Sequence, residues 1–328
     1  MRRREFITLL GGAAFTHALP SAAQPKRLPV VAFVSPSVPL AEIVGADPVY
    51  PPARAFVHGL RDLGWIDGRN VIIERRSAED DPQRAPAIYA ELLARGVDVI
   101  MPGGSRWMQG AALLATRNIP IIAVFTEDPV AADLIKSLAR PGGNLTGVTV
   151  AVGPDIQSKR LQLLAEFAPG ITRVAFLAPP EVLALLGRIA RPAGVTIVPV
   201  QVEFVGQYDG AFATILRERA DALLAIGSIH YVYFQRITAF ASESRLPAIY
   251  GIREAVEAGG LMCYGASVPG AFRQSARLVD RILKGARPED LPTEQPTAFE
   301  LVINAKTAQA LGLTMPLSII AQADEVIE

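Results

Sequence analysis

The stretch PGGNLTGVTV at Pro141–Val150 lies between two halves of the chain that resemble each other. Three pairs of similar segments flank it, and they occur in the same order on both sides. The pairs are VVAFVSP (30–36) with RVAFLAP (173–179), DVIMPGGS (98–105) with DALLAIGS (221–228), and IPII (119–122) with LPAI (246–249). Ordered self-similarity is typical of a chain built from repeated structural units. The sequence therefore predicts two similar lobes, with Pro141–Val150 as a crossing between them.

Apolar runs of strand length alternate with helical stretches on both sides of this crossing. The expected strands are 28–35, 70–75, 97–101 and 119–125 in the first half, and 173–177, 196–200, 220–225 and 247–250 in the second. Nearly continuous apolar strands separated by helices are typical of parallel sheets that are covered on both faces. We therefore predict an α/β fold of two doubly wound parallel-sheet lobes, joined by a hinge of several segments.

The later part of the chain extends this pattern beyond the repeated strands. Strand-like runs at 260–265 and 299–304 are followed by helical stretches at 271–284 and 305–311. We expect residues 145–150 to form a strand that enters the second lobe, and the chain to revisit the first lobe before it ends in the second.

The N-terminus has the features of an export signal. Arg2 to Arg4 precede an apolar run of about 10 residues, and Ser21 to Ala23 supply small residues for cleavage. A membrane span would need about 20 residues. The paired arginines also resemble the twin-arginine export motif. We expect residues 1–23 to be a removed signal peptide of that type and the rest to be a soluble periplasmic protein; the alternative is an amphipathic start to an ordinary helix.

Composition and charge narrow the classes of function. The chain of 328 residues has 32 basic and 32 acidic residues, so it lacks the basic excess of a nucleic-acid or anionic-membrane surface. Its single cysteine, Cys263, lies in an apolar run, which excludes an intramolecular disulfide and favours a buried thiol. We expect no nucleic-acid partner.

The candidate binding residues follow the predicted strands. In open α/β sheets, ligands bind beyond the carboxyl ends of the strands, so two such sheets that face each other form a cleft. The predicted ligand-binding residues of the first lobe are Ser35, Gly104, Ser105, Phe125, Thr126 and Asp128. Those of the second lobe are Ser228, Tyr231, Tyr250, Arg253 and Tyr264.

Four of these positions also have a purely structural interpretation. Ser105, after two glycines at the start of a helix, either caps that helix or helps to bind an anion. Asp128 before Pro129 is either a helix cap or the partner of a ligand ammonium. Arg253 either clamps a carboxylate or pairs with Glu254 or solvent. Tyr231 either stacks on a ligand or belongs to the core.

Signals for catalysis are weak. Ser105 follows a strand, as the nucleophile of a serine hydrolase does, but Trp107 occupies the position where that elbow requires glycine. His58 and His230 have no metal-binding spacing, and no GxGxxG motif follows a strand. We predict no catalytic residues, no metal and no cofactor, and keep a secreted serine hydrolase as an alternative.

Several separate stretches resemble one family. They are RRREFITLLGGAA (2–14), ARPGGNLTG (139–147), FELVINAKTAQALGL (299–313) and ADEVIE (323–328). Together they resemble the ABC-transporter substrate-binding proteins of the tryptophan/tyrosine-type group. The resemblance implies the type I periplasmic-binding fold, a small-molecule ligand held in the cleft, hinge closure, and delivery to a membrane permease. It favours a monomeric binding protein over an enzyme; the alternative within this fold is a module that presents its ligand to a sensor.

The resemblance also implies domain boundaries and a ligand class. It implies that residues 260–285 return to the first lobe. Lobe one is then 28–143 plus 259–287, and lobe two is 144–258 plus 288–328. The later hinge crossings are expected near 258–260 and 286–290. Asp128-Pro129-Val130 matches the family's pattern at the cleft. Many members of the family carry an Asn-Pro motif where this chain has Ala178-Pro179, so a side-chain amide that could hold a ligand is missing. The expected ligand class is therefore wider than amino acids and includes other small carboxylates.

Overall fold

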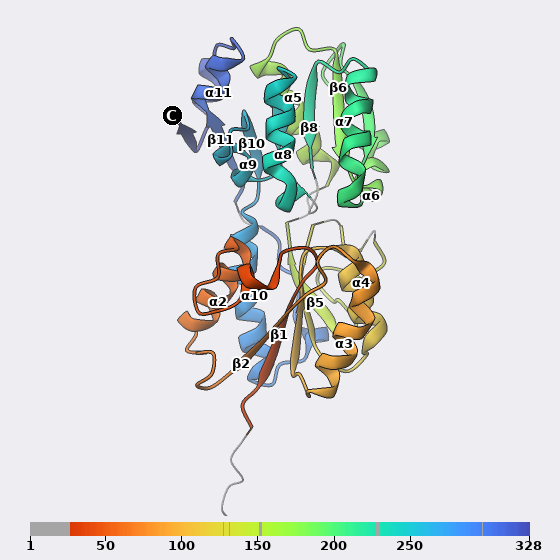
Figure 1. The fold of residues 1–328 in the computed structure, drawn as a ribbon, viewed down its shortest axis with the longest axis vertical. Coiled ribbons are helices and arrows are strands. Elements are labelled where there is room, and N and C mark those ends of the chain that lie inside the picture. Colours follow the sequence, from red (N-terminus) through yellow and green to blue (C-terminus); the bar gives the residue numbers. More distant parts are fainter. Residues whose placement is uncertain (1–26, 127, 131, 151–152, 227–229, 297) are drawn as a thin grey trace, which may run out of the picture.

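The computed structural model describes residues 27–126, 128–130, 132–150, 153–226, 230–296 and 298–328 and shows two lobes, one above the other in Figure 1. The side chains of residues 181 and 230–232 are not described. The expected signal peptide, 1–23, lies outside the described residues. Within them, no helix is both long and apolar enough to cross a membrane.

Lobe one is built on a parallel sheet of five strands in the order β2-β1-β3-β4-β5. The strands are β1 (Val30–Ser35), β2 (Ile72–Ser77), β3 (Val99–Pro102), β4 (Ile121–Phe125) and β5 (Leu145–Thr149). One face packs against α2 (Pro51–Asp62) and α10 (Val268–Leu283). The other packs against α3 (Ala85–Ala94) and α4 (Arg106–Ala115). The short α1 (Leu40–Ile43) follows β1.

Burial on both faces explains the apolar run that begins lobe one. In β1, Val31 and Phe33 belong to the core beneath α2 and α10, whereas Val30, Ala32 and Val34 belong to the core beneath α3 and α4. Successive side chains of a strand point to opposite faces, so a strand between two helical layers is apolar at every position.

Lobe two has a seven-stranded sheet in the order β12-β11-β10-β9-β8-β6-β7, parallel except between β10 and β11. Its strands are β6 (Arg173–Ala178), β7 (Thr196–Gln201), β8 (Ala222–Ala225), β9 (Ala248–Tyr250), β10 (Met262–Gly265), β11 (Glu300–Asn304) and β12 (Glu325–Ile327). One face packs against α7 (Tyr208–Arg217), α8 (His230–Glu243) and α9 (Arg253–Glu257). The other packs against α5 (Pro154–Phe167), α6 (Pro180–Leu183), α11 (Ala305–Ala310) and α12 (Leu317–Ile320). The α/β prediction with two largely parallel lobes is confirmed.

The prediction that residues 145–150 enter lobe two is wrong. β5 pairs with β4 along its whole length, from Ile121 opposite Leu145 to Phe125 opposite Thr149. A Cβ on Gly147 would lie 1.9 Å from the carbonyl oxygen of Ala123, so only glycine permits this close pairing. The strand therefore completes the sheet of lobe one, and the chain crosses to lobe two after it rather than at residue 144.

The placement of 260–265 in lobe one is also wrong. β10 pairs with β9 and β11 in the sheet of lobe two. The chain crosses after β10, and α10 then packs on α2, where Gly59 lies so close that a Cβ there would be 2.9 Å from the Cβ of Ala276. This second crossing therefore comes after residue 265 rather than near 258–260.

The return to lobe two also occurs later than predicted. Leu291 is buried in the core of lobe one, and its carbonyl accepts a hydrogen bond from Thr146 Oγ1 at 2.7 Å. Glu294 exchanges backbone hydrogen bonds with Gly147 and Thr149 at 2.9 and 2.8 Å. Residues 288–294 therefore lie along the β5 edge of lobe one, and the third crossing follows them rather than lying at 286–290.

Candidate ligand-binding site

The two sheets meet at the carboxyl ends of their parallel strands (Figure 1). Asp80 follows β2, and its carboxylate accepts a hydrogen bond from the backbone N–H of Val205, which follows β7. Tyr50 of lobe one lies near Glu254 of lobe two; burial first, and then the charges of Glu254 and Glu42, raise the pKa of its phenol. Contacts between the lobes are thus made by the loops where this fold class binds ligands.

The loops after β1, β3 and β4 are packed together. A Cβ on Gly103 would lie 2.3 Å from Cδ of Pro36, so the β3 loop rests directly on the β1 loop. Thr126 Oγ1 donates to the carbonyl of Gly104 at 2.9 Å, which ties the β4 loop to the β3 loop. Ser105 Oγ accepts from the N–H of Met108 at 3.4 Å and caps α4. The structure therefore brings Gly104, Ser105 and Thr126 together at the start of a helix, as an anion site requires.

Three other residues predicted for lobe one lie in different settings. Ser35 is 1% exposed, and its Oγ accepts from the N–H of Val38 at 2.9 Å, so it holds the β1 turn. Phe125 is fully buried in the core beneath α3 and α4. Asp128 is exposed and accepts from the N–H of Val130 at 2.9 Å. No helix occurs among the described residues between β4 and β5, so Asp128 forms a turn rather than a helix cap.

Lobe two contributes fewer of the predicted groups. The ring of Tyr250 is packed in the core beneath α8 and α9, and its hydroxyl is buried without a hydrogen-bond partner among the described residues. Tyr264 is half-buried, with its ring 6.0 Å from that of Phe299. Ser228 and the side chain of Tyr231 lie outside the described residues.

Arg253 is held by carboxylates of its own lobe. Its guanidinium forms ion pairs with Glu257 at 2.8 Å, Glu300 at 3.4 Å and Glu325 at 2.6 Å. These hydrogen bonds and charges raise the pKa of Arg253. An arginine already paired with three carboxylates has little charge left to attract a ligand, so the network is better suited to holding α9 against β11 and β12.

A residue that the sequence analysis did not single out, Arg160, lies where the strands of lobe two end. It is on α5 and only 4% exposed. Its Nε donates to the carbonyl of Tyr264 at 2.6 Å, and its Nη1 donates to Gln157 Oε1 at 2.9 Å. Burial lowers the pKa of Arg160 to about 10, so the side chain remains cationic at neutral pH. The sequence signal was weak because Arg160 lies within an ordinary amphipathic helix.

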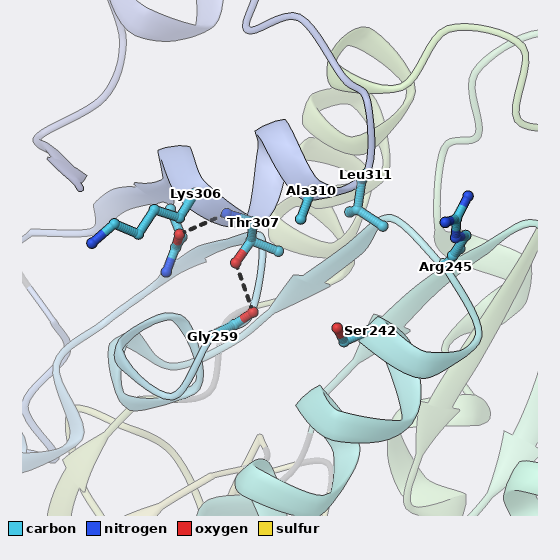
Figure 2. Close-up of a pocket in the computed structure, with 8 residues that line it drawn as sticks. Ser242, Arg245, Gly259, Lys306, Thr307, Ala310 and Leu311 are labelled. Carbon is cyan, nitrogen blue, oxygen red and sulfur yellow. Dashed lines mark hydrogen bonds between the residues drawn. The ribbon is translucent and has the colours of Figure 1, made fainter.

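A surface cavity of about 510 Å³ lies elsewhere in lobe two (Figure 2). It is lined by residues around the start of α11, which is at the end of lobe two away from lobe one (Figure 1). Thr307 donates through Oγ1 to the carbonyl of Gly259 and through its N–H to Asn304 Oδ1, each at 2.9 Å. This part of the polar lining is engaged in internal bonds, and none of the predicted site residues lines this cavity.

Two parallel-sheet lobes, which meet at their strand ends and are linked by several crossings, define a two-lobed ligand-binding protein of the type I periplasmic-binding fold. The comparison with known families agrees with this class. Residues 37–327 match the family model described as ABC transporter substrate binding protein, and the chain belongs to that family. Substrate-binding proteins of this kind are extracellular or periplasmic.

Known relatives support the same assignment. The chain is 25% identical over 266 residues to a tyrosine-binding protein of Clostridioides difficile strain R20291, which covers 79% of this chain and 76% of the relative. Its fold is similar to that of a conserved domain protein from Vibrio cholerae, with a TM-score of 0.81 and 24% identity over 92% of this chain and 100% of the other. An ABC domain from Streptococcus pneumoniae in complex with L-Trp has a TM-score of 0.80 and 23% identity, with the same coverage.

Proposed function

We propose that this protein captures an aromatic L-amino acid between its two lobes and delivers it to the membrane permease of an ABC transporter. The observation that carries the proposal is that the lobes contact each other through the loops at the carboxyl ends of their strands, as in the pair Asp80 and Val205. Closure of the lobes then encloses a ligand at the place where parallel sheets bind one. The ligand class is supported by the relatives, which are a tyrosine-binding protein and an L-Trp complex.

In this proposal, the groups of lobe one contact the polar end of the ligand. Gly104, Ser105 and Thr126 surround the start of α4, where backbone N–H groups and the helix dipole favour a negative charge. Asp128 is exposed near the start of the loop after β4 and supplies a carboxylate for the ammonium group. Ser228 and Tyr231 remain proposed contacts from lobe two.

The proposal also includes the export route of the protein and the absence of catalysis. Residues 1–23 act as a twin-arginine signal, so the mature protein works in the periplasm. It works there as a monomer. Ser105 is a helix cap rather than an activated nucleophile, because its Oγ accepts from the Met108 N–H.

Isothermal calorimetry and thermal shift with the mature protein test this function. L-tryptophan and L-tyrosine are expected to bind with micromolar affinity, about −8 kcal/mol, and to raise the melting temperature because only the folded state binds them. L-leucine is the control for a general preference for amino acids, and benzoate is the control for a general preference for aromatic acids. Failure of both aromatic amino acids to bind, or ester turnover that disappears in Ser105→Ala, would contradict the proposal.

A further inference from the structure

Arg160 carries a buried positive charge, and its hydrogen-bond acceptors within the described part of the chain are neutral. Its two hydrogen bonds are to the Tyr264 carbonyl and the Gln157 side-chain amide. Among the described residues, the titratable side chains that interact electrostatically with it are the thiol of Cys263 and the phenol of Tyr264, and neither is a carboxylate. A guanidinium has five N–H donors. Those of Nη2 have no hydrogen-bond partner in the described part of the chain.

Such an arrangement is unfavourable for folding alone. An ion removed from water without a counter-ion costs several kcal/mol, even after the protein relaxes. A neutral donor such as glutamine would satisfy one carbonyl without that cost. Arg253, 93 positions later, shows the contrast, since it is paired with three carboxylates of its own lobe. No carboxylate of the described residues serves as a counter-ion for Arg160, and this points to a partner from outside that part of the chain.

The guanidinium lies at the ligand-binding end of the sheet. Its Nη2 is 3.4 Å from the place of a Cβ on Gly251, which follows β9, and 3.2 Å from that of a Cβ on Gly265, which ends β10. Neither glycine has a positive φ, so backbone conformation does not require glycine there. Gly265 is also required by the 2.0 Å approach of its Cβ position to the Gly251 carbonyl oxygen. The two glycines therefore place no side chain of their own against the guanidinium at these strand ends.

We propose that Arg160 binds the carboxylate of the ligand and is thereby the anchor contributed by lobe two. The inference rests on the proposed function and names the group that fixes the ligand's orientation. Nη2 and a neighbouring donor of the fork form a two-point hydrogen bond with the carboxylate, which supplies the missing counter-charge. The carboxylate then lies between Arg160 and the donors at the start of α4, and the ammonium group faces Asp128 of lobe one.

The test compares ligands that differ in the carboxylate alone. L-tryptophan and tryptamine share the indole and the ammonium, and only the first has a carboxylate. The mature wild-type protein is expected to bind L-tryptophan roughly 100-fold more tightly than tryptamine, the discrimination that a buried charge pair supplies. In Arg160→Gln this ratio is expected to fall below about 10, with Arg160→Lys between the two because it keeps the charge but loses the fork.

Controls separate anchoring from a structural role. Arg253→Gln removes a cation of the same lobe and is expected to leave the ratio unchanged. The melting temperature of unliganded Arg160→Gln is expected to stay equal or rise, because an unpaired buried charge has been removed. If Arg160→Gln still binds L-tryptophan and keeps the wild-type ratio of the two affinities, this inference is overturned and the proposed function is not. Binding of none of these probes, nor of L-tyrosine, by the wild type would overturn the proposed function and this inference together.

Discussion

Gly251 and Gly265 flank the same guanidinium, yet substitution by alanine is expected to affect them very differently. A Cβ at Gly265 would lie 2.0 Å from the carbonyl oxygen of Gly251 and 2.9 Å from its carbonyl carbon, both of which are backbone atoms. A Cβ at Gly251 would meet the tip of Ile226 at 3.3 Å and Nη2 of Arg160 at 3.4 Å, both of which are ends of flexible side chains. The first contact can be relieved only by separating two strands, whereas small side-chain movements relieve the second.

The magnitudes follow from these contacts. Carbon and oxygen atoms in contact are separated by about 3.5 Å, so Gly265→Ala creates an overlap of well over 1 Å, and we expect a loss of about 3 kcal/mol of unfolding free energy. Gly251→Ala is expected to cost less than about 1 kcal/mol. Urea denaturation of the two variants measures the difference, with comparable slopes as the sign that the unfolded state is unchanged. Equal midpoints for the two variants would refute the packing argument.

Three further predictions concern stability and ligand binding. Burial raises the pKa of the Asp80 carboxyl more than the Val205 hydrogen bond lowers it, so folding favours the protonated form. The contribution of Asp80 to the free energy of unfolding, measured by urea denaturation, should therefore rise as the pH falls from 7 toward that raised pKa, and Asp80→Asn should lack this component; an unchanged pH profile in the variant would contradict it. Asp128→Asn is expected to weaken the binding of L-tryptophan roughly tenfold, about 1.4 kcal/mol. The binding of indole-3-propionate, which has no ammonium group, should not change; equal losses of affinity for both ligands would exclude an ammonium contact. Tyr250→Phe removes a buried hydroxyl that has no described partner, so its melting temperature should match or exceed that of the wild type, and a clear decrease would reveal a missed hydrogen bond.

The sequence was sufficient to predict the architecture but not the assignment of every strand to its sheet. The two lobes followed from the repeated segments, and the alternating strands and helices and the buried Cys263 followed from apolar patterning; the structure has all of them. β5 and β10 were assigned to the wrong lobes because each lies beside a crossing. An apolar strand at such a place satisfies its pattern in either sheet, and only hydrogen-bond partners distant in sequence decide between them.

The site was less predictable for a related reason. Position after a strand selected Gly104, Ser105 and Thr126, which the structure brings together and which stay predicted ligand contacts. The same rule also selected Phe125 and Tyr250, whose rings turn into the cores, since a residue at a strand end can point to either face. The sequence does not mark Arg160, because what distinguishes it is the lack of a counter-ion among the described residues. That lack is visible only when the neighbours from β9 and β10 are in place.

The packing of α10 against lobe one also constrains the order in which the protein is made. Synthesis completes the sheet of lobe one with β5, but α2 covers only part of the face that carries Phe33, and the rest stays uncovered until Phe272 emerges more than a hundred residues later and packs 6.0 Å from it. Lobe two in turn waits for β11 and β12, which follow α10 in the chain. A growing chain therefore leaves part of an apolar sheet face exposed while residues 150–267 are made, and lobe one is completed only after most of lobe two has been synthesised. A fragment that ends before α10 should therefore not fold as a stable half.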